Sequence, residues 1–116
     1  MDETKNALIT STMLGIEDHG ILTFRLDLDY GGSGQAAGAY ALDAYSEELA
    51  RRVGTAAGTE FILALLRVLD VRKWEDLKGQ HLRVRHSFNG VHAVGHLLKD
   101  QWLDFEEFFA AYREAR

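Results

Sequence analysis

The chain has 116 residues, of which 47% are hydrophobic and 27% charged, and its formal net charge is −5 at pH 7. These proportions are typical of a globular domain, and the length supports one hydrophobic core, so we expect a single domain over residues 1–116. The acidic balance argues against broad binding to the nucleic-acid backbone. Because the chain has no cysteine, disulfides, thiolate catalysis and cysteine zinc sites are excluded.

From the sequence we also expect no segment that directs the protein into a membrane. No stretch approaches ~18 consecutive apolar residues, the length that a spanning helix needs. The first residues, MDETKNALIT, are charged and polar where a signal peptide would be apolar. We therefore expect no membrane association and a location in a bacterial-type cytoplasm.

The clearest pattern covers residues 21–35, ILTFRLDLDYGGSGQ. Apolar and polar residues alternate through residue 30, which predicts a strand buried on one face only. Asp27 and Asp29 lie on its polar face, where carboxylates are suitable partners for ribose hydroxyls or for an arginine.

A glycine-rich segment follows this strand and permits positive φ angles, so its backbone N–H groups are candidates to contact a ligand or a neighbouring chain. The candidate contacts are Gly32, Ser33, Gly34 and Gln35. The segment lacks the lysine and hydroxyl residue of a P-loop. The alternative is a plain connection between two strands.

Four further segments lie before and within the centre of the chain. Residues 6–16 are predicted to form a weakly alternating strand, and residues 17–20 a polar turn. Residues 37–42 are predicted to form a short strand. Residues 43–58 are a mixed region in which a segment of helical composition is followed by Gly54 and Gly58. The turn joins the first two strands as an antiparallel hairpin. The strongest helical pattern covers residues 59–71, where few polar positions predict a central helix buried on most sides.

The remaining third of the chain predicts a second hairpin and a last helix. Residues 81–87 and 91–98 alternate on either side of Asn89 and Gly90, a strong hairpin signal. Before this hairpin, Trp74 and Leu77 predict a short helical turn that is fixed to the core. After it, Asp104 and Glu107 fit a helix cap, and an aromatic stripe follows.

These elements together predict an α+β fold. Its antiparallel sheet consists of two hairpins and a short strand, and it is packed by a central helix and a C-terminal helix.

Two arginines alternate with apolar residues in the second hairpin, so we expect both on the face opposite the core. Arg83 and Arg85, with His86 and His92, predict a local positive patch that suits phosphate, carboxylate or an acidic protein surface. The alternative is that the arginines pair with the two aspartates of the first hairpin across adjacent strands.

The histidines also suggest a metal site, because His86 and His92 are candidate cross-strand neighbours and His92 and His96 are expected to share one face. The chain has no HExxH motif, and only Asp100 adds a carboxylate nearby. The turn Glu17, Asp18 and His19 contains acid–base residue types, but no nucleophile elbow accompanies it. We therefore predict no metal, no cofactor and no enzymatic activity.

Several segments of the chain resemble those of a known group of proteins. The similarity covers most of the chain and is densest over residues 11–42. The segments are STMLGIEDHGILTF, LDYGGSGQ, YALD, GTEFI, WEDLKGQHLRVR and GHLLKDQWLD. They resemble a group of small uncharacterised proteins of tailed phages and prophages. Such proteins are often glycine-rich after GGSGQ, whereas this chain has Ala36, Ala37 and Ala39, which predicts a stiffer loop. The resemblance implies a phage or prophage origin. A small phage protein without a catalytic signature is commonly an accessory factor, and one such role, by analogy, is to disable a host defence.

The leading hypothesis is therefore a homo-oligomeric phage protein, in the cytoplasm of an infected host, that binds and sequesters a nucleotide-type signalling molecule. Arg83, Arg85 and His86 would hold phosphate, Asp29 would hold ribose, and the glycine-rich segment would close over the ligand. One alternative is an inhibitor that binds a host defence protein directly, in the manner of an anti-CRISPR protein. The other is a small metal-dependent enzyme.

Overall fold

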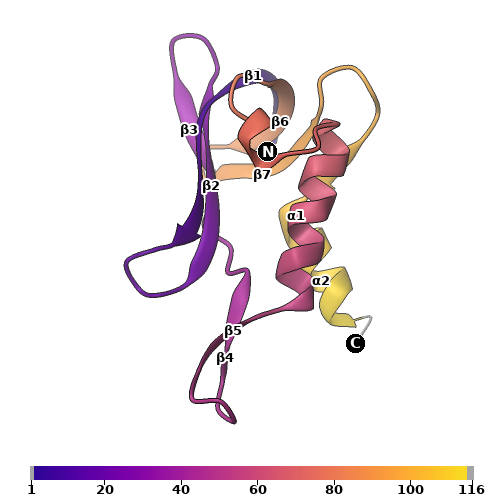
Figure 1. Ribbon diagram of the computed structural model, residues 1–116. Coiled ribbons are helices and arrows are strands. Elements are labelled where there is room, and N and C mark those ends of the chain that lie inside the picture. Colours follow the sequence, from indigo (N-terminus) through magenta and orange to yellow (C-terminus); the bar gives the residue numbers. More distant parts are fainter. Residues whose placement is uncertain (1, 115–116) are drawn as a thin grey trace.

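Within residues 2–114, six strands form one antiparallel sheet in the order β3-β2-β1-β6-β7-β8 (Figure 1). The computed structural model describes residues 2–114. The strands of the sheet are β1 (Glu3–Ile16), β2 (Leu22–Asp29), β3 (Gly34–Gly38), β6 (His81–Ser87), β7 (Gly90–His96) and β8 (Trp102–Asp104). Both predicted hairpins, β1–β2 and β6–β7, are present, and the predicted α+β class is confirmed.

The sheet is organised around β1, which is long enough to pair with two strands along different halves of its length. Its N-terminal half pairs with β6, from Glu3 opposite His86, and its C-terminal half pairs with β2, as far as Ile16 opposite Leu22. The register shifts by one residue at Thr10, and such a bulge bends a strand. The sheet consequently curls, and its edge strand β3 also contacts β7.

The interior of the curl is the hydrophobic core, and the predicted alternation of β2 is confirmed. Phe24, Leu26 and Leu28 are buried, while Arg25 and Asp29 are exposed. Because side chains alternate between the two faces of a strand, β2 presents one apolar face to the core and one polar face to water.

Two helices, α1 (Ala56–Leu69) and α2 (Phe105–Glu114), lie on the same side of the sheet (Figure 1). The buried row of α1 includes Phe61 and Leu65, and the Phe61 ring lies 5.7 Å from that of Phe105. Within residues 61–69 only Leu63, at 43%, and Arg67 are exposed, and the other apolar residues lie in the core or pack against it, as predicted for a helix that is covered on most sides. The predicted cap of α2 is confirmed, since Glu107 N donates to Asp104 Oδ1 at 2.9 Å.

Most of residues 43–58 do not adopt the helix that the composition of this region suggests. They contain a separate hairpin, β4 (Asp43–Ser46) and β5 (Arg51–Gly54), which extends away from the helices and the sheet (Figure 1). Its base is fixed by Arg52, which donates to the Asp43 carboxylate through Nε at 3.0 Å and Nη2 at 2.8 Å. A diagonal cross-strand ion pair of this kind stabilises the hairpin relative to the helix that the composition favours.

The start of α1 also differs from the prediction, because the helix begins at Ala56 and includes Gly58. Thr55 caps it by accepting a hydrogen bond from Gly58 N at 2.9 Å, and the Thr55 hydroxyl donates to Leu42 O at 3.0 Å. A Cβ on Gly58 would overlap the Leu42 carbonyl oxygen. Glycine therefore belongs in this helical turn because the helix closely approaches another backbone segment there.

The third strand occupies residues 34–38, earlier than the predicted 37–42. Tyr30 N donates to Ser33 O at 2.8 Å, which closes a tight turn directly after β2. Gly38 and Ala39 then adopt positive φ angles of 135° and 68° and end the strand. The glycine-rich segment is thus a hairpin turn, followed by strand residues that pair with β2.

The short helical turn before the second hairpin is confirmed as a 3-10 turn, η1 (Trp74–Asp76). Leu77 is fully buried, and Trp74 Nε1 donates to Thr12 Oγ1 at 3.1 Å.

Candidate functional site

A hollow of about 390 Å³, which we name the basin, lies where the two hairpins of the sheet meet. It is lined by Glu3 and Lys5 of β1, Tyr30 at the end of β2, residues 33–35 of the next turn and strand, and residues 86–88 of the β6–β7 hairpin. Four predicted site residues, Ser33, Gly34, Gln35 and His86, are therefore brought together.

The topology explains why residues so distant in sequence meet at the basin. Glu3 lies opposite His86 in the pairing of β1 with β6, and His86 follows Leu82 and Val84 on the buried face of β6. The curl of the sheet brings β3 against β7, so the residues that follow Tyr30 reach the same end of the core.

A chain of two side-chain hydrogen bonds closes the basin on one side. Tyr30 OH donates to Gln35 Oε1 at 2.7 Å, and Gln35 Nε2 donates to Ser87 O at 3.2 Å. Burial raises the pKa of Tyr30, so its hydroxyl remains a neutral donor at physiological pH. Gln35 consequently connects β3 to the turn of the second hairpin.

Aromatic and cationic groups gather at the same place. The rings of Tyr30 and His86 have centroids 5.0 Å apart and are tilted by 36°, and Lys5 Nζ lies 5.3 Å from the Tyr30 ring centre. His86 Nε2 is buried and has no hydrogen-bond partner within residues 2–114. A buried nitrogen without a partner is costly, and it is the one side-chain polar atom in this state in the described part of the chain.

Phe88 stands at the rim of the basin and is fully exposed. The backbone beneath it is held by Ser87, whose hydroxyl oxygen accepts from Asn89 N at 3.2 Å and contacts His92 Nε2 at 2.7 Å. The turn is therefore ordered by side-chain bonds while the ring of Phe88 points into solvent.

The Ser87–His92 contact invites comparison with a catalytic pair, because Asp2 Oδ1 also lies 3.5 Å from His92 Nε2. In a catalytic triad the acid binds the imidazole nitrogen that faces away from the nucleophile. Here serine and aspartate meet the same nitrogen, and the serine oxygen also accepts a turn N–H. The geometry does not match that of an activated nucleophile.

The polar groups of the glycine-rich turn mostly make hydrogen bonds within the turn itself. Asp29 Oδ1 accepts from Gly31 N at 2.8 Å, and Gly31 and Gly32 have φ angles of 84° and 101°. Asp27 accepts a hydrogen bond from Ser11 and pairs with Arg25 Nε at 3.2 Å. Both predicted aspartates thus hold neighbouring strands and turns, and neither lines the basin.

The structure separates Arg83 and Arg85 from His86. Successive side chains of a strand point to opposite faces, and both guanidiniums lie over the ring of Trp102, at 4.9 Å and 4.0 Å. Arg83 also donates to the carbonyl oxygens of His96 and Lys99, each at 2.8 Å.

The proposed pairing of these arginines with Asp27 and Asp29 is wrong, because β1 lies between β2 and β6 in the sheet. Trp102 gave no sign of this role in the sequence, since the contact depends on where β8 joins the sheet.

The histidines are also arranged differently from the prediction. A register shift places His86 opposite Val91 and makes His92 the extra residue of a bulge, so His86 and His92 are not paired. His96 Nδ1 instead accepts from the backbone N–H groups of residues 98 and 99, both at 3.0 Å. Among residues 2–114, no group of three or more His, Asp or Glu could hold a metal ion.

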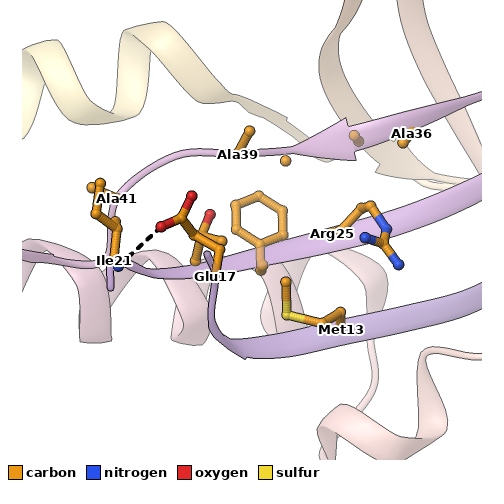
Figure 2. A pocket seen from close by; sticks show the side chains of 11 residues that line it. Met13, Glu17, Ile21, Arg25, Ala36, Ala39 and Ala41 are labelled. Carbon is orange, nitrogen blue, oxygen red and sulfur yellow. Dashed lines mark hydrogen bonds between the residues drawn. The ribbon is translucent and has the colours of Figure 1, made fainter. Parts of the chain in front are cut away.

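A second hollow, of about 330 Å³, was not foreseen from the sequence (Figure 2). It opens between the first hairpin and five small residues that leave space beside Met13 and Ile21: Ala36, Ala37, Gly38, Ala39 and Ala41. Glu17 points into it in Figure 2, and its carboxylate accepts from Ile21 N at 3.1 Å. The contact of this carboxylate with His19 Nδ1, at 3.0 Å, holds the pKa of Glu17 below its usual range. Glu17 therefore fastens its own turn, and the lining of this hollow is mostly apolar.

Comparisons with family models, curated proteins and solved structures found no match to this chain. Within residues 2–114, no helix has the length and apolar character required to cross a membrane.

Proposed function

We propose that the protein is a non-enzymatic phage accessory protein that binds and sequesters a nucleotide-type signalling molecule in the basin. The observation that carries the proposal is the convergence of the Tyr30–His86 aromatic pair, the Lys5 ammonium group and a row of hydroxyl and amide groups around one hollow. The resemblance of the sequence to small phage proteins supports the phage part of the proposal.

The residues of the basin suit the parts of a nucleotide. Aromatic rings stack on nucleobases of any sequence, which Tyr30 and His86 supply. Lys5 supplies a charge-assisted donor for phosphate. Ser33 and Glu3, both exposed on the lining, are suited to bind sugar hydroxyls. The proposal thus transfers the phosphate contact from the two arginines of β6 to Lys5.

Native mass spectrometry of the protein, after incubation with a nucleotide-containing extract of a phage-susceptible host, tests the proposal. We expect the protein to retain a small molecule of a few hundred daltons per site. The masses in the same spectra also give the number of subunits in the assembly. Lys5→Ala should weaken retention by about 10-fold or more, the effect of losing a charge-assisted hydrogen bond. Lys78→Ala is the matched control, because Lys78 is also exposed but lies outside the basin. A wild-type mass equal to that of the bare polypeptide would contradict the proposal.

A second candidate function, direct inhibition of a host defence protein, is favoured by the β4–β5 hairpin. Tyr45 and Leu49 are 59% and 55% exposed on this hairpin, which extends away from the rest of the chain (Figure 1). Exposed apolar side chains on a projecting hairpin are suited to a protein partner. In the same mass spectra, a retained host protein in place of a small ligand would favour this function.

A further inference from the structure

We infer that the basin selects a planar ring that carries a single negative charge, and that Phe88 closes over this ring from the side opposite Tyr30 and His86. The inference rests on the proposed function and narrows it to one class of nucleotide-type ligand.

The charge of the ligand follows from the charged groups around the basin. Apart from His86, the titratable side chains of its lining are Glu3, Lys5 and the phenol of Tyr30. Arg83 and Arg85 lie over Trp102 on the opposite face of β6. A ligand with several phosphates would therefore meet one ammonium group and one carboxylate, and most of its charge would be uncompensated. A ligand with one negative charge needs one cationic partner, which Lys5 supplies, while the Glu3 carboxylate accepts from the hydroxyl groups of the ligand.

The position of Lys5 makes it available to such an anion. Its ammonium group rests 5.3 Å from the centre of the Tyr30 ring, a contact worth little at an exposed site. Lys5 is itself exposed and carries a flexible side chain. When the anion enters, the ammonium group exchanges the ring of Tyr30 for the ligand and leaves aromatic surface free for stacking.

The preference for a planar ring follows from the three aromatic side chains that line the basin. Tyr30 and His86 form one wall, and Phe88 stands on the rim with its whole side chain in water. The bonds of Ser87 with Asn89 and Gln35 fix the backbone below Phe88, so rotation of its side chain is sufficient to close the ring over a ligand. Burial against a planar ligand removes this apolar surface from water and adds aromatic stacking.

Titration calorimetry of the full chain tests the inference with four probes: adenosine, 3′,5′-cyclic AMP, ATP and ribose 5-phosphate, with cyclic GMP as a second base. We expect a cyclic nucleotide to bind at least about 10-fold more tightly than the uncharged nucleoside, the triphosphate and the sugar phosphate that lacks a base, because of one charge-assisted bond and one stacking contact. Phe88→Ala should weaken that binding by about 10-fold. Leu98→Ala should leave it unchanged, because Leu98 is another strongly exposed apolar residue, at 86%, and lies outside the basin.

Two results would overturn the inference. One is tightest binding of ATP or ribose 5-phosphate, and the other is equal binding by Phe88→Ala and Leu98→Ala. If either occurs while Lys5→Ala still weakens binding, the proposed function stands and only this inference fails. If none of the probes binds and the extract leaves the protein bare, both fail.

Discussion

Gln35 joins the two hairpins at the basin, and its replacement by leucine measures how strongly this connection holds the site. Gln35→Leu keeps a side chain of similar size but removes the bonds to Tyr30 OH and Ser87 O. Each partly buried hydrogen bond contributes ~1 kcal/mol, so we expect the free energy of unfolding to fall by ~2 kcal/mol. With an unfolding entropy of ~0.24 kcal/mol/K for 116 residues, this corresponds to a melting temperature lower by ~8 °C.

A double-mutant cycle monitored by urea unfolding separates this effect from a change of packing. Tyr30→Phe should cost ~1 kcal/mol in the native chain and almost nothing once Gln35 is leucine, because the bond is then already lost. Gln80→Leu is the control, since the half-buried side chain of Gln80 makes no hydrogen bond to the described residues. Equal costs of Tyr30→Phe in both backgrounds would refute the role assigned to the network.

Two further changes test how the scaffold is held. Gly58→Ala should lower the free energy of unfolding by ~1–3 kcal/mol in urea titrations, because overpacking against Leu42 O exceeds the ~1 kcal/mol that alanine gains in a helix. Gly54→Ala is the control and should be near neutral, because a Cβ at Gly54 has open space. A Gly58→Ala variant that is more stable than the native chain would contradict the close approach of the helix to Leu42. The hydrogen bonds from Arg52 hold the pKa of Asp43 below its usual range in the folded protein. The pair should therefore stabilise the fold at pH values above ~3.9, the ordinary carboxyl pKa, and this stabilisation should be lost as the pH falls through the lower pKa of the folded state. Arg52→Met should remove this acid-dependent part of the unfolding curve, and an unchanged pH profile between about pH 7 and pH 2 would show that the pair does not matter.

The two hairpins of the sheet could be predicted because their signals are local. Residues 21–30 alternate in step with burial, and Asn89 and Gly90 mark the turn of the second hairpin. The β4–β5 hairpin could not be predicted in this way, since part of its sequence favours a helix, and the pairing of Asp43 with Arg52 that accompanies the hairpin is not a local pattern. Local propensity is a weak prior that such tertiary contacts override.

The basin was predicted only in part, for a similar reason. Gln35 and His86 were candidates from their own segments, whereas Lys5 was missed because the first strand was expected to begin at residue 6. Glu3 and Lys5 alternate in step with the buried Ala7, which is the signal that the strand extends further. Their place beside His86 depends on pairing with β6, a strand that begins only at His81, and no local pattern contains that information.

The shared role of β1 has a consequence for the order in which the molecule assembles. The first three strands pair with neighbours in sequence, so this part of the sheet can form as soon as the chain has passed residue 38. The N-terminal half of β1, with Glu3 and Lys5, has no partner until β6 has been synthesised, because that pairing joins residues as far apart in sequence as Glu3 and His86. A nascent chain that stops short of β6 would therefore contain much of the scaffold but no ligand site, and binding activity would arise only at the last stage of folding.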